Sequence, residues 1–277
     1  MSQNICYNYL VANLQQLKRQ FLEYLEIERG RAQNTISNYD HYLSRFLDFT
    51  KNNDPEKIDD SMVREFRLWL NRQSTGNNRA TGETLSKKTQ NYYLIALRAF
   101  LKYMARQEIK SMPAERIELA KVGERSLDLI TQTELGRLLN SPNGNELKDL
   151  RDKAILELLF STGLRVSELC SLPRDIDLRS DELSIRGKGG KVRVVFISDE
   201  AKNYLKKYLN ARKDMSDALF IQVEPADTKV LASKNKIGSP KNMNIKSLSR
   251  RSIERIVKQH AIKAGISKRV TPHVMRH

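Results

Sequence analysis

The chain has 277 residues, of which 39% are hydrophobic and 30% are charged, and 49 lysines and arginines against 33 acidic residues give it a formal net charge of +16 at pH 7. These values are typical of a globular protein with one large or two modest domains, and no apolar run reaches the ~20 residues of a membrane span. Met1 to Gln15 lacks the pattern of a signal peptide. Two cysteines make neither a disulfide framework nor a metal site, which favours the reducing cytoplasm. Together with the lack of a signal peptide and of a membrane span, this predicts a cytoplasmic protein with no membrane partner.

Residues 1–107 have the periodicity of four helices. Apolar residues recur at helical spacing from Leu14 to Leu25, and a second stripe follows Asn34, a candidate N-cap. Asp60 is a candidate cap for the third helix, and the fourth is expected from about Thr84 to Arg106, after a glycine- and asparagine-rich loop. One side of that fourth helix carries Tyr92, Ala96, Ala99 and Tyr103. A small helical bundle is therefore expected.

A change of pattern over residues 108–130 predicts a linker between two domains. Pro113 and Gly123 interrupt this stretch, and no apolar face continues through it. The second domain, residues 131–277, begins with a helix start at Thr131, followed by an acid in the first turn.

Within the second domain the period changes from helical to strand-like and back. A helix from about Leu147 to Ser161 is expected to end before Gly163, and a short helix follows from Arg165 to Ser171. Alternating apolar residues around the turn at Gly187–Gly190 predict a β-hairpin, and Glu200–Arg212 returns to helix. The expected fold class is mainly α with a small β-hairpin or sheet.

The last part of the chain is the most basic. From Lys236 to Arg276 it contains eleven basic residues and one acid, Glu254, and includes a predicted helix from Ser249 to Ala264. Pro272 suits the first turn of one more helix. The surplus favours a polyanionic partner, most often nucleic acid, although a solvated basic face has the same composition.

Three short motifs of the second domain place polar side chains beside helix ends and turns. They are T-G-L-R-V-S-E-L, G-K-G-G-K-V-R and T-P-H-V-M-R-H. The candidate site residues within them are Arg165, Glu168, Lys188, His273, Arg276 and His277. Taken one at a time, each has an ordinary interpretation as a surface ion pair, a solvated turn lysine or a helix-end histidine.

In this order and spacing the motifs resemble those of the tyrosine site-specific recombinases, especially Xer-type recombinases and phage-type integrases. The resemblance covers nearly the whole chain, with Met275 where the family usually has leucine, a tolerable apolar exchange. It implies a SAM-like core-binding domain in the N-terminal half and a recombinase catalytic domain, incomplete at its C-terminal end, in the remainder.

The resemblance also implies catalytic roles. Arg165 and Arg276 match the two arginines that bind the scissile phosphate, a task suited to the permanent charge and donor fork of guanidinium. Lys188, with Lys191 as its rival, matches the lysine that protonates the leaving 5′ oxygen. His273 matches a histidine that transfers protons or binds phosphate.

Two supporting residues and the nucleophile complete the implied site. Glu168 matches the acid that supports the first arginine, and His277 matches a packing or supporting histidine. In the family the nucleophilic tyrosine follows H-x-x-R-H, whereas the ten tyrosines here lie between Tyr7 and Tyr208. The nucleophile is therefore unknown and expected beyond His277, and the chain as written is expected to be cut short, binding DNA without cleaving it.

The implied reaction is site-specific recombination through a covalent 3′-phosphotyrosine, with no metal and no other cofactor. The implied partners are double-stranded DNA with a specific, inverted-repeat site and further recombinase subunits, four on DNA when full length. Chromosome-dimer resolution, and hence chromosome partition, is favoured modestly over mobile-element integration or excision.

Two other functions fit the sequence. One is a non-catalytic DNA-binding accessory or regulatory protein on the same scaffold, which the reading frame beyond codon 277 would distinguish. The other is a basic, helical RNA-binding protein, which competition between inverted-repeat duplex and structured RNA would distinguish.

Overall fold

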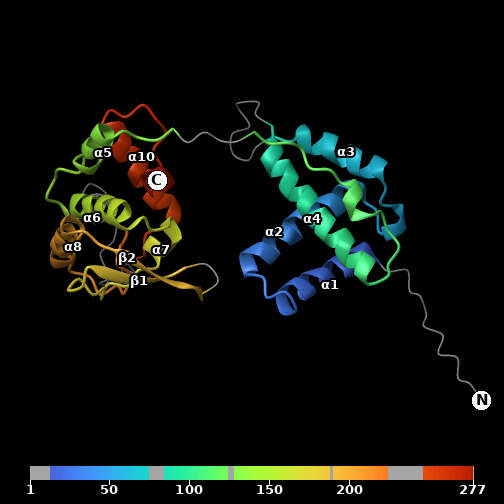
Figure 1. Ribbon diagram of the computed structural model, residues 1–277, viewed down its shortest axis with the longest axis horizontal. Helices are drawn as coiled ribbons and strands as arrows, with labels where there is room; N and C mark the ends of the chain where they lie inside the picture. Colours follow the sequence, from blue (N-terminus) through green and yellow to red (C-terminus); the bar gives the residue numbers. More distant parts are fainter. Residues whose placement is uncertain (1–12, 75–83, 124–127, 188–189, 224–245, 277) are drawn as a thin grey trace, which may run out of the picture. The chain divides into compact units, whose positions relative to one another are not determined.

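The computed structural model describes residues 13–74, 84–123, 128–187, 190–223 and 246–276 (Figure 1). The chain divides into two compact units, Met1–Glu124 and Arg125–His277. Helices predominate in both, and the described residues of the second unit include a two-stranded antiparallel sheet. None of the described helices is long and apolar enough to cross a bilayer.

Four α-helices build the first unit (Figure 1). They are α1 Leu14–Ile27, α2 Gln33–Thr50, α3 Asp60–Asn71 and α4 Lys87–Arg106, with short 3₁₀ turns at Pro55–Lys57 and Ala114–Arg116. Each α-helix buries a stripe of apolar residues against the others, and together these stripes form one core. The helical bundle expected from the sequence is confirmed.

Three helix starts of the first unit differ from the sequence-based expectation, and one of them is α4, which begins at Lys87 rather than near Thr84. The cap of α3 is Asp59, not Asp60, because its extended backbone lets the carboxylate accept a hydrogen bond from the Met62 N–H at 2.8 Å. The second helix, α2, already begins at Gln33, so Asn34 lies inside it and caps nothing. The expected cap residues were wrong, although both helices were correctly located.

The buried side of α4 agrees with the expected stripe at Ala96, Ala99 and Tyr103 but not at Tyr92. Tyr92 is 44% exposed, whereas its neighbour Tyr93 is buried. The buried residues of α4 are Tyr93, Leu94, Ala96, Leu97, Phe100, Leu101, Tyr103 and Met104. The ring of Tyr93 lies 4.6 Å from that of Tyr42 in α2 and 6.3 Å from that of Phe66 in α3, so the packing partners of α4 decide which tyrosine faces inward.

The first part of the segment 108–130 packs against this core. Met112, Ala114 and Ile117 are buried, around the 3₁₀ turn Ala114–Arg116. Pro113 precedes this turn with an extended backbone. The described part of the segment up to residue 123 therefore lies within the first unit.

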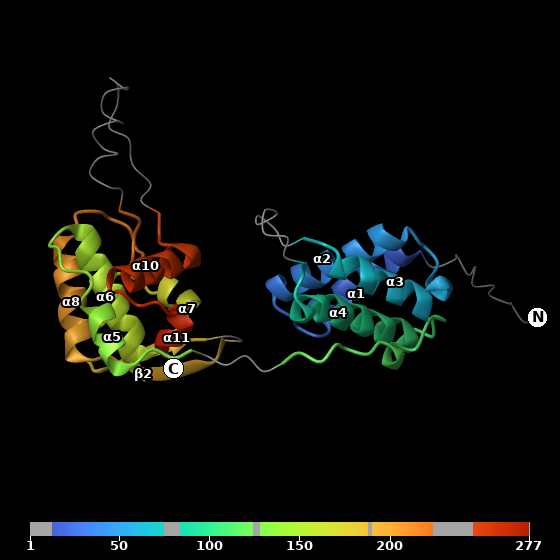
Figure 2. The ribbon, with the colours of Figure 1, turned by 90° about the horizontal axis from the view of Figure 1, so that it is seen from above.

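The second unit surrounds helix α6 (Figures 1 and 2). Its elements are α5 Gln132–Leu139, α6 Leu147–Thr162, α7 Val166–Cys170, β1 Glu182–Arg186, β2 Val192–Phe196, α8 Asp199–Ala211, α10 Arg250–Lys263 and α11 Pro272–Arg276. Helices α5, α8, α10 and α11 all contact α6. Each of these elements was predicted within about two residues, and Thr131 and Glu134 form the capping box at the start of α5.

Buried polar side chains join α10 to α6 and to Ser141, which follows the end of α5. His260 of α10 is 1% exposed, with Nδ1 2.9 Å from Ser141 Oγ and Nε2 3.3 Å from Asp152 Oδ2. Asp152 also accepts two hydrogen bonds from Arg151. Burial raises the pKa of Asp152, but the bonds from His260 and Arg151 outweigh it, so the pKa lies below its usual value. Each buried polar group therefore has a partner, as burial requires.

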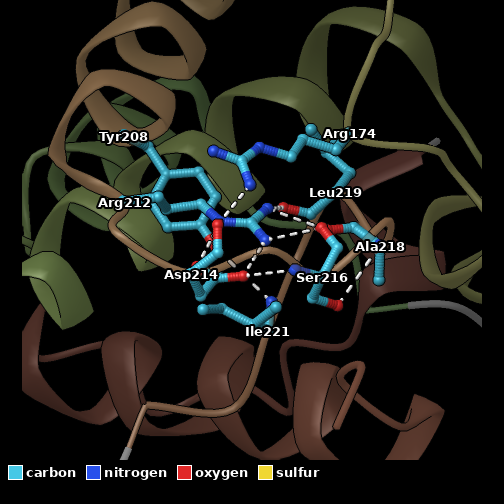
Figure 3. Close-up of polar contacts among 8 residues, drawn as sticks. All are labelled: Arg174, Tyr208, Arg212, Asp214, Ser216, Ala218, Leu219 and Ile221. Atoms are coloured by element: carbon cyan, nitrogen blue, oxygen red, sulfur yellow. Dashed lines mark hydrogen bonds and ion pairs between the residues drawn. The ribbon is translucent and has the colours of Figure 1, made fainter. Parts of the chain in front are cut away.

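A second buried ion pair joins the end of α8 to the strand-like segment that follows it (Figure 3). The Arg212 guanidinium donates to both carboxylate oxygens of Asp214, at 2.8 and 2.6 Å, and to the carbonyls of Ala218 and Leu219, each at 2.8 Å. The Arg212 Cζ lies 5.7 Å from the centroid of the Tyr208 ring. The hydrogen bonds from Arg212 lower the pKa of Asp214 to about 2.

We expect Arg212→Met to lower the stability of the second unit by about 3–5 kcal/mol, because it leaves a buried carboxylate and carbonyl groups without their donor. Urea denaturation followed by circular dichroism measures this. Arg179→Met is the matched control, since Arg179 pairs with Asp177 on the surface, with 92% of its side chain exposed. The control should leave the transition in place. Equal effects of the two substitutions would contradict a structural role for the buried pair.

Candidate active site

The end of α6 determines where Arg165 lies. Gly163 follows the helix in the left-handed conformation, with φ of +57°, and its N–H donates to the Leu159 carbonyl. Glycine adopts this conformation without the strain that a Cβ introduces. The chain turns at Gly163, and the next residue, Leu164, is buried in the core. Arg165 is then the N-cap residue of α7, with 52% of its side chain exposed.

Glu168, on the first turn of α7, is the buried acceptor of the site. Its carboxylate accepts from the Arg165 N–H at 2.8 Å and from Arg165 Nη1 at 3.0 Å. It also accepts from Arg193 Nη1 at 2.7 Å and Nη2 at 2.8 Å. Hydrogen bonding from Arg193 is the largest cause that lowers the Glu168 pKa to about 2, followed by the bonds from Arg165, despite burial.

The β-hairpin brings its turn against this carboxylate. Strands β1 and β2 pair from Glu182↔Phe196 to Arg186↔Val192, and the Gly187 N–H donates to the Lys191 carbonyl at 2.7 Å. A Cβ placed on Gly187 would lie 3.4 Å from both Glu168 Oε1 and Arg193 Nη1. The start of the turn therefore lies beside Glu168.

The last helix brings Arg276 to the same region. Helix α11 packs on α6, with Val274 and Met275 buried and His273 and Arg276 exposed (Figure 2). The Arg276 Cγ lies 3.4 Å from where a Cβ on Gly163 would be. Arg276 thus passes over the residue that ends α6, two positions before Arg165, although the two arginines are far apart in sequence.

The structure brings together the elements that carry Arg165, Glu168 and Arg276. Lys188 and His277 lie outside the described residues. Lys191, the rival of Lys188, is exposed at the start of β2. No group of metal-binding side chains is found within the described ranges of the chain.

The sequence-based reasoning gave no role to Arg193. The signal was its position in β2, where residues alternate between the two faces. Val192, Val194 and Phe196 are exposed, whereas Val195 is buried and Arg193 is half-buried on the same face as Val195. An arginine at an inward-facing strand position requires an acceptor, which here is Glu168.

The two tyrosines of α8, Tyr204 and Tyr208, pack in the second unit. Tyr208 is fully buried, and its hydroxyl oxygen accepts a hydrogen bond from the Ile221 N–H at 3.3 Å. Burial raises its pKa. Tyr204 is partly buried against the core, with Lys153 Nζ 4.7 Å from its ring centroid.

The low pKa of Glu168 predicts how the stability of the protein changes with pH. Its pKa falls from an ordinary 4.5 to about 2 on folding, so its stabilising contribution is full above pH 4.5 and is lost as pH falls towards 2. Unfolding free energies of the wild type and Glu168→Gln, measured by urea denaturation between pH 6 and pH 2.5, should therefore converge on acidification. Asp214 is shared by both proteins, so it cancels in the difference. A difference independent of pH would show that the carboxylate is not the stabilised group.

Two family models match the chain, and together they span most of it. Residues 128–277 match the phage integrase family, and residues 19–108 match the phage integrase N-terminal SAM-like domain. Among curated proteins, the chain is 33% identical over 270 residues to tyrosine recombinase XerD of Oceanobacillus iheyensis, covering 93% of this chain and 80% of the relative. It is 31% identical over 267 residues to tyrosine recombinase XerC of Bacillus subtilis, covering 96% of this chain and 82% of the relative.

Solved structures share the fold. A lambda integrase tetramer bound to a Holliday junction matches with a TM-score of 0.65 at 16% identity, covering 95% of this chain and 70% of that one. XerH recombinase bound to a palindromic difH substrate matches with a TM-score of 0.61 at 22% identity, covering 94% of this chain and 71% of that one. From the matched domains and relatives, the chain belongs to the phage integrase family of tyrosine recombinases.

Proposed function

We propose that this chain performs the phosphate chemistry of site-specific DNA recombination with Arg165 and Arg276 as its two phosphate-binding residues. The observation that carries the proposal is the meeting at Gly163 of the helix end before Arg165 and the side chain of Arg276. The membership of the chain in the tyrosine recombinases supplies the reaction. Both side chains are accessible from solvent, as contact with a DNA backbone requires.

The two guanidiniums act on the transition state. Attack by a tyrosine hydroxyl on the scissile phosphorus increases the negative charge on the non-bridging oxygens, which two fixed cations stabilise. The new bond joins the phosphorus to the tyrosine oxygen, and the bond to the 5′ oxygen breaks. A 5′ hydroxyl from a partner duplex then attacks the phosphotyrosine, releases the tyrosine and restores a phosphodiester, so no external energy source is needed.

Proton transfer is the second part of the proposal. The departing 5′ oxygen must gain a proton, which we assign to Lys188, between β1 and β2 in the sequence, with Lys191 as the alternative donor. His273 lies three residues before Arg276 on α11, so the two share one helical face. We assign it to phosphate binding or proton transfer, and His277 to support of that site. The nucleophilic tyrosine is not assigned to any of the ten in this chain.

Duplex DNA with an inverted-repeat site and further recombinase subunits are the proposed partners. The net charge of +16 supports a DNA partner. The similar XerH was solved on a palindromic substrate, and lambda integrase was solved as a tetramer on a Holliday junction. Since the chain is similar to recombinases named XerD and XerC, we assign it to chromosome-dimer resolution in the cytoplasm rather than to mobile-element transfer.

If Arg165 and Arg276 bind the scissile phosphate, substitution of either arginine should abolish most of the DNA-cleaving activity. We expect Arg165→Ala and Arg276→Ala each to reduce covalent protein–DNA adduct by at least about 100-fold. The assay uses the gene product translated to its stop codon and a nicked suicide duplex, with adduct resolved on a denaturing gel. Arg179→Ala, which removes an exposed arginine, is the control and should retain the wild-type rate.

Two outcomes would contradict the proposal in different ways. Adduct formed at the wild-type rate by either arginine variant would show that the phosphate-binding residues are wrongly assigned. A wild-type protein that binds inverted-repeat duplex but forms no adduct would favour a non-catalytic accessory protein on the same scaffold.

The charge predicts strongly salt-dependent DNA binding. Contacts to six to ten phosphates reduce affinity by about 10³- to 10⁵-fold between 50 and 200 mM salt, so fluorescence anisotropy with the 277-residue chain should show a steep linear decrease of log affinity with log salt. Inverted-repeat duplex should compete better than structured RNA of equal length. Preference for the RNA would support the RNA-binding alternative.

A further inference from the structure

The side chain of Arg193 donates two hydrogen bonds to the Glu168 carboxylate, whereas the side chain of Arg165 donates one. Its Nη1 and Nη2 donate to the two carboxylate oxygens in parallel, at 2.7 and 2.8 Å. Arg165 reaches the same carboxylate through one side-chain nitrogen, Nη1, at 3.0 Å. The fork of Arg193 is the geometry in which guanidinium binds carboxylate most strongly.

Because Arg193 supplies most of the side-chain hydrogen bonds to Glu168, most N–H groups of the Arg165 side chain do not bind this carboxylate. A guanidinium carries five N–H groups, and among the described residues the hydrogen bonds of the Arg165 side chain involve only its Nη1. About half of that side chain is exposed. The two arginines and one carboxylate also leave a net charge of +1 at the site.

The two hydrogen bonds between Arg193 and Glu168 also connect two separate elements. Glu168 lies on α7 and Arg193 on β2, whose pairing with β1 fixes its position in the hairpin. The backbone of Gly187 lies against both groups, since a Cβ at this residue would be in van der Waals contact with Arg193 Nη1 and Glu168 Oε1, each at 3.4 Å. The carboxylate therefore has little freedom to rotate while Arg193 is bound.

We propose that Arg193 is a positioning residue for the recombination reaction, because it occupies Glu168 and so keeps the donors of Arg165 directed at the scissile phosphate. This inference rests on the proposed function. Without Arg193, the carboxylate is free to bind Arg165 through a fork of its own, which withdraws from the phosphate the donors that stabilise the transition state. Lysine replaces arginine poorly here, since an ammonium group offers no planar fork.

The test is a double-mutant cycle on the rate of adduct formation, at protein concentrations that saturate the suicide duplex. Arg193→Met should reduce the rate by up to about 100-fold, with the DNA dissociation constant changed less than threefold. Arg193→Lys should lie between Arg193→Met and the wild type. In a Glu168→Gln background, Arg193→Met should have little further effect, because the competing carboxylate is already absent.

Arg186→Met is the matched control. It removes an exposed arginine from the same hairpin and should leave the saturated rate within about twofold of the wild type, as expected for a surface change. Circular dichroism checks that each variant is folded, and if Arg193→Met is not, Arg193→Lys and its combination with Glu168→Gln complete the cycle.

Three results would overturn the inference. They are a wild-type rate in Arg193→Met, a loss confined to DNA affinity, or the same rate loss in the Glu168→Gln background as in the wild type. Failure of the proposed function would look different, because the wild-type protein itself would then form no adduct. A wild type without adduct would overturn the proposed function and, with it, this inference.

Discussion

The carboxylate of Glu168 faces two guanidiniums that come from different elements, and the proposed site depends on how it divides its hydrogen bonds between them. One arginine, Arg193, is bound at both oxygens, while Arg165 is bound through one nitrogen and its own backbone N–H. A buried anion costs free energy unless it is fully hydrogen-bonded, and within the described part of the chain these two residues are the donors to Glu168. The requirement to satisfy one buried charge thus fixes both the helix start at Arg165 and the position of the hairpin.

Much of the fold follows from local sequence, because caps, glycines and periodicity act over a few residues. The helix start at Thr131, the helix end before Gly163 and the pairing of two strands on either side of a glycine-rich turn were predicted from such signals and are present where expected. The choice between Tyr92 and Tyr93 could not be made this way. Both fit the helical period of α4, and the packing of Tyr93 against Tyr42 of α2 and Phe66 of α3 decides which is buried.

The site could be predicted only in part. Arg165 and Arg276 were found because they stand in family motifs, and each motif is short enough to read in one stretch of sequence. Arg193 was not, since its role depends on a contact with Glu168 across 25 positions, and no local pattern encodes which inward-facing strand residue meets which acid. The burial of Glu168 and its double contact with Arg193 become visible only in three dimensions.

The central claim is that Arg165 and Arg276 bind one phosphate. A crystal structure of the protein on an inverted-repeat duplex tests this most directly. Both guanidiniums should lie within about 3 Å of the non-bridging oxygens of the same phosphate, with Glu168 still bound by Arg193. Arginines bound to different phosphates, or directed into solvent away from the DNA, would contradict the account.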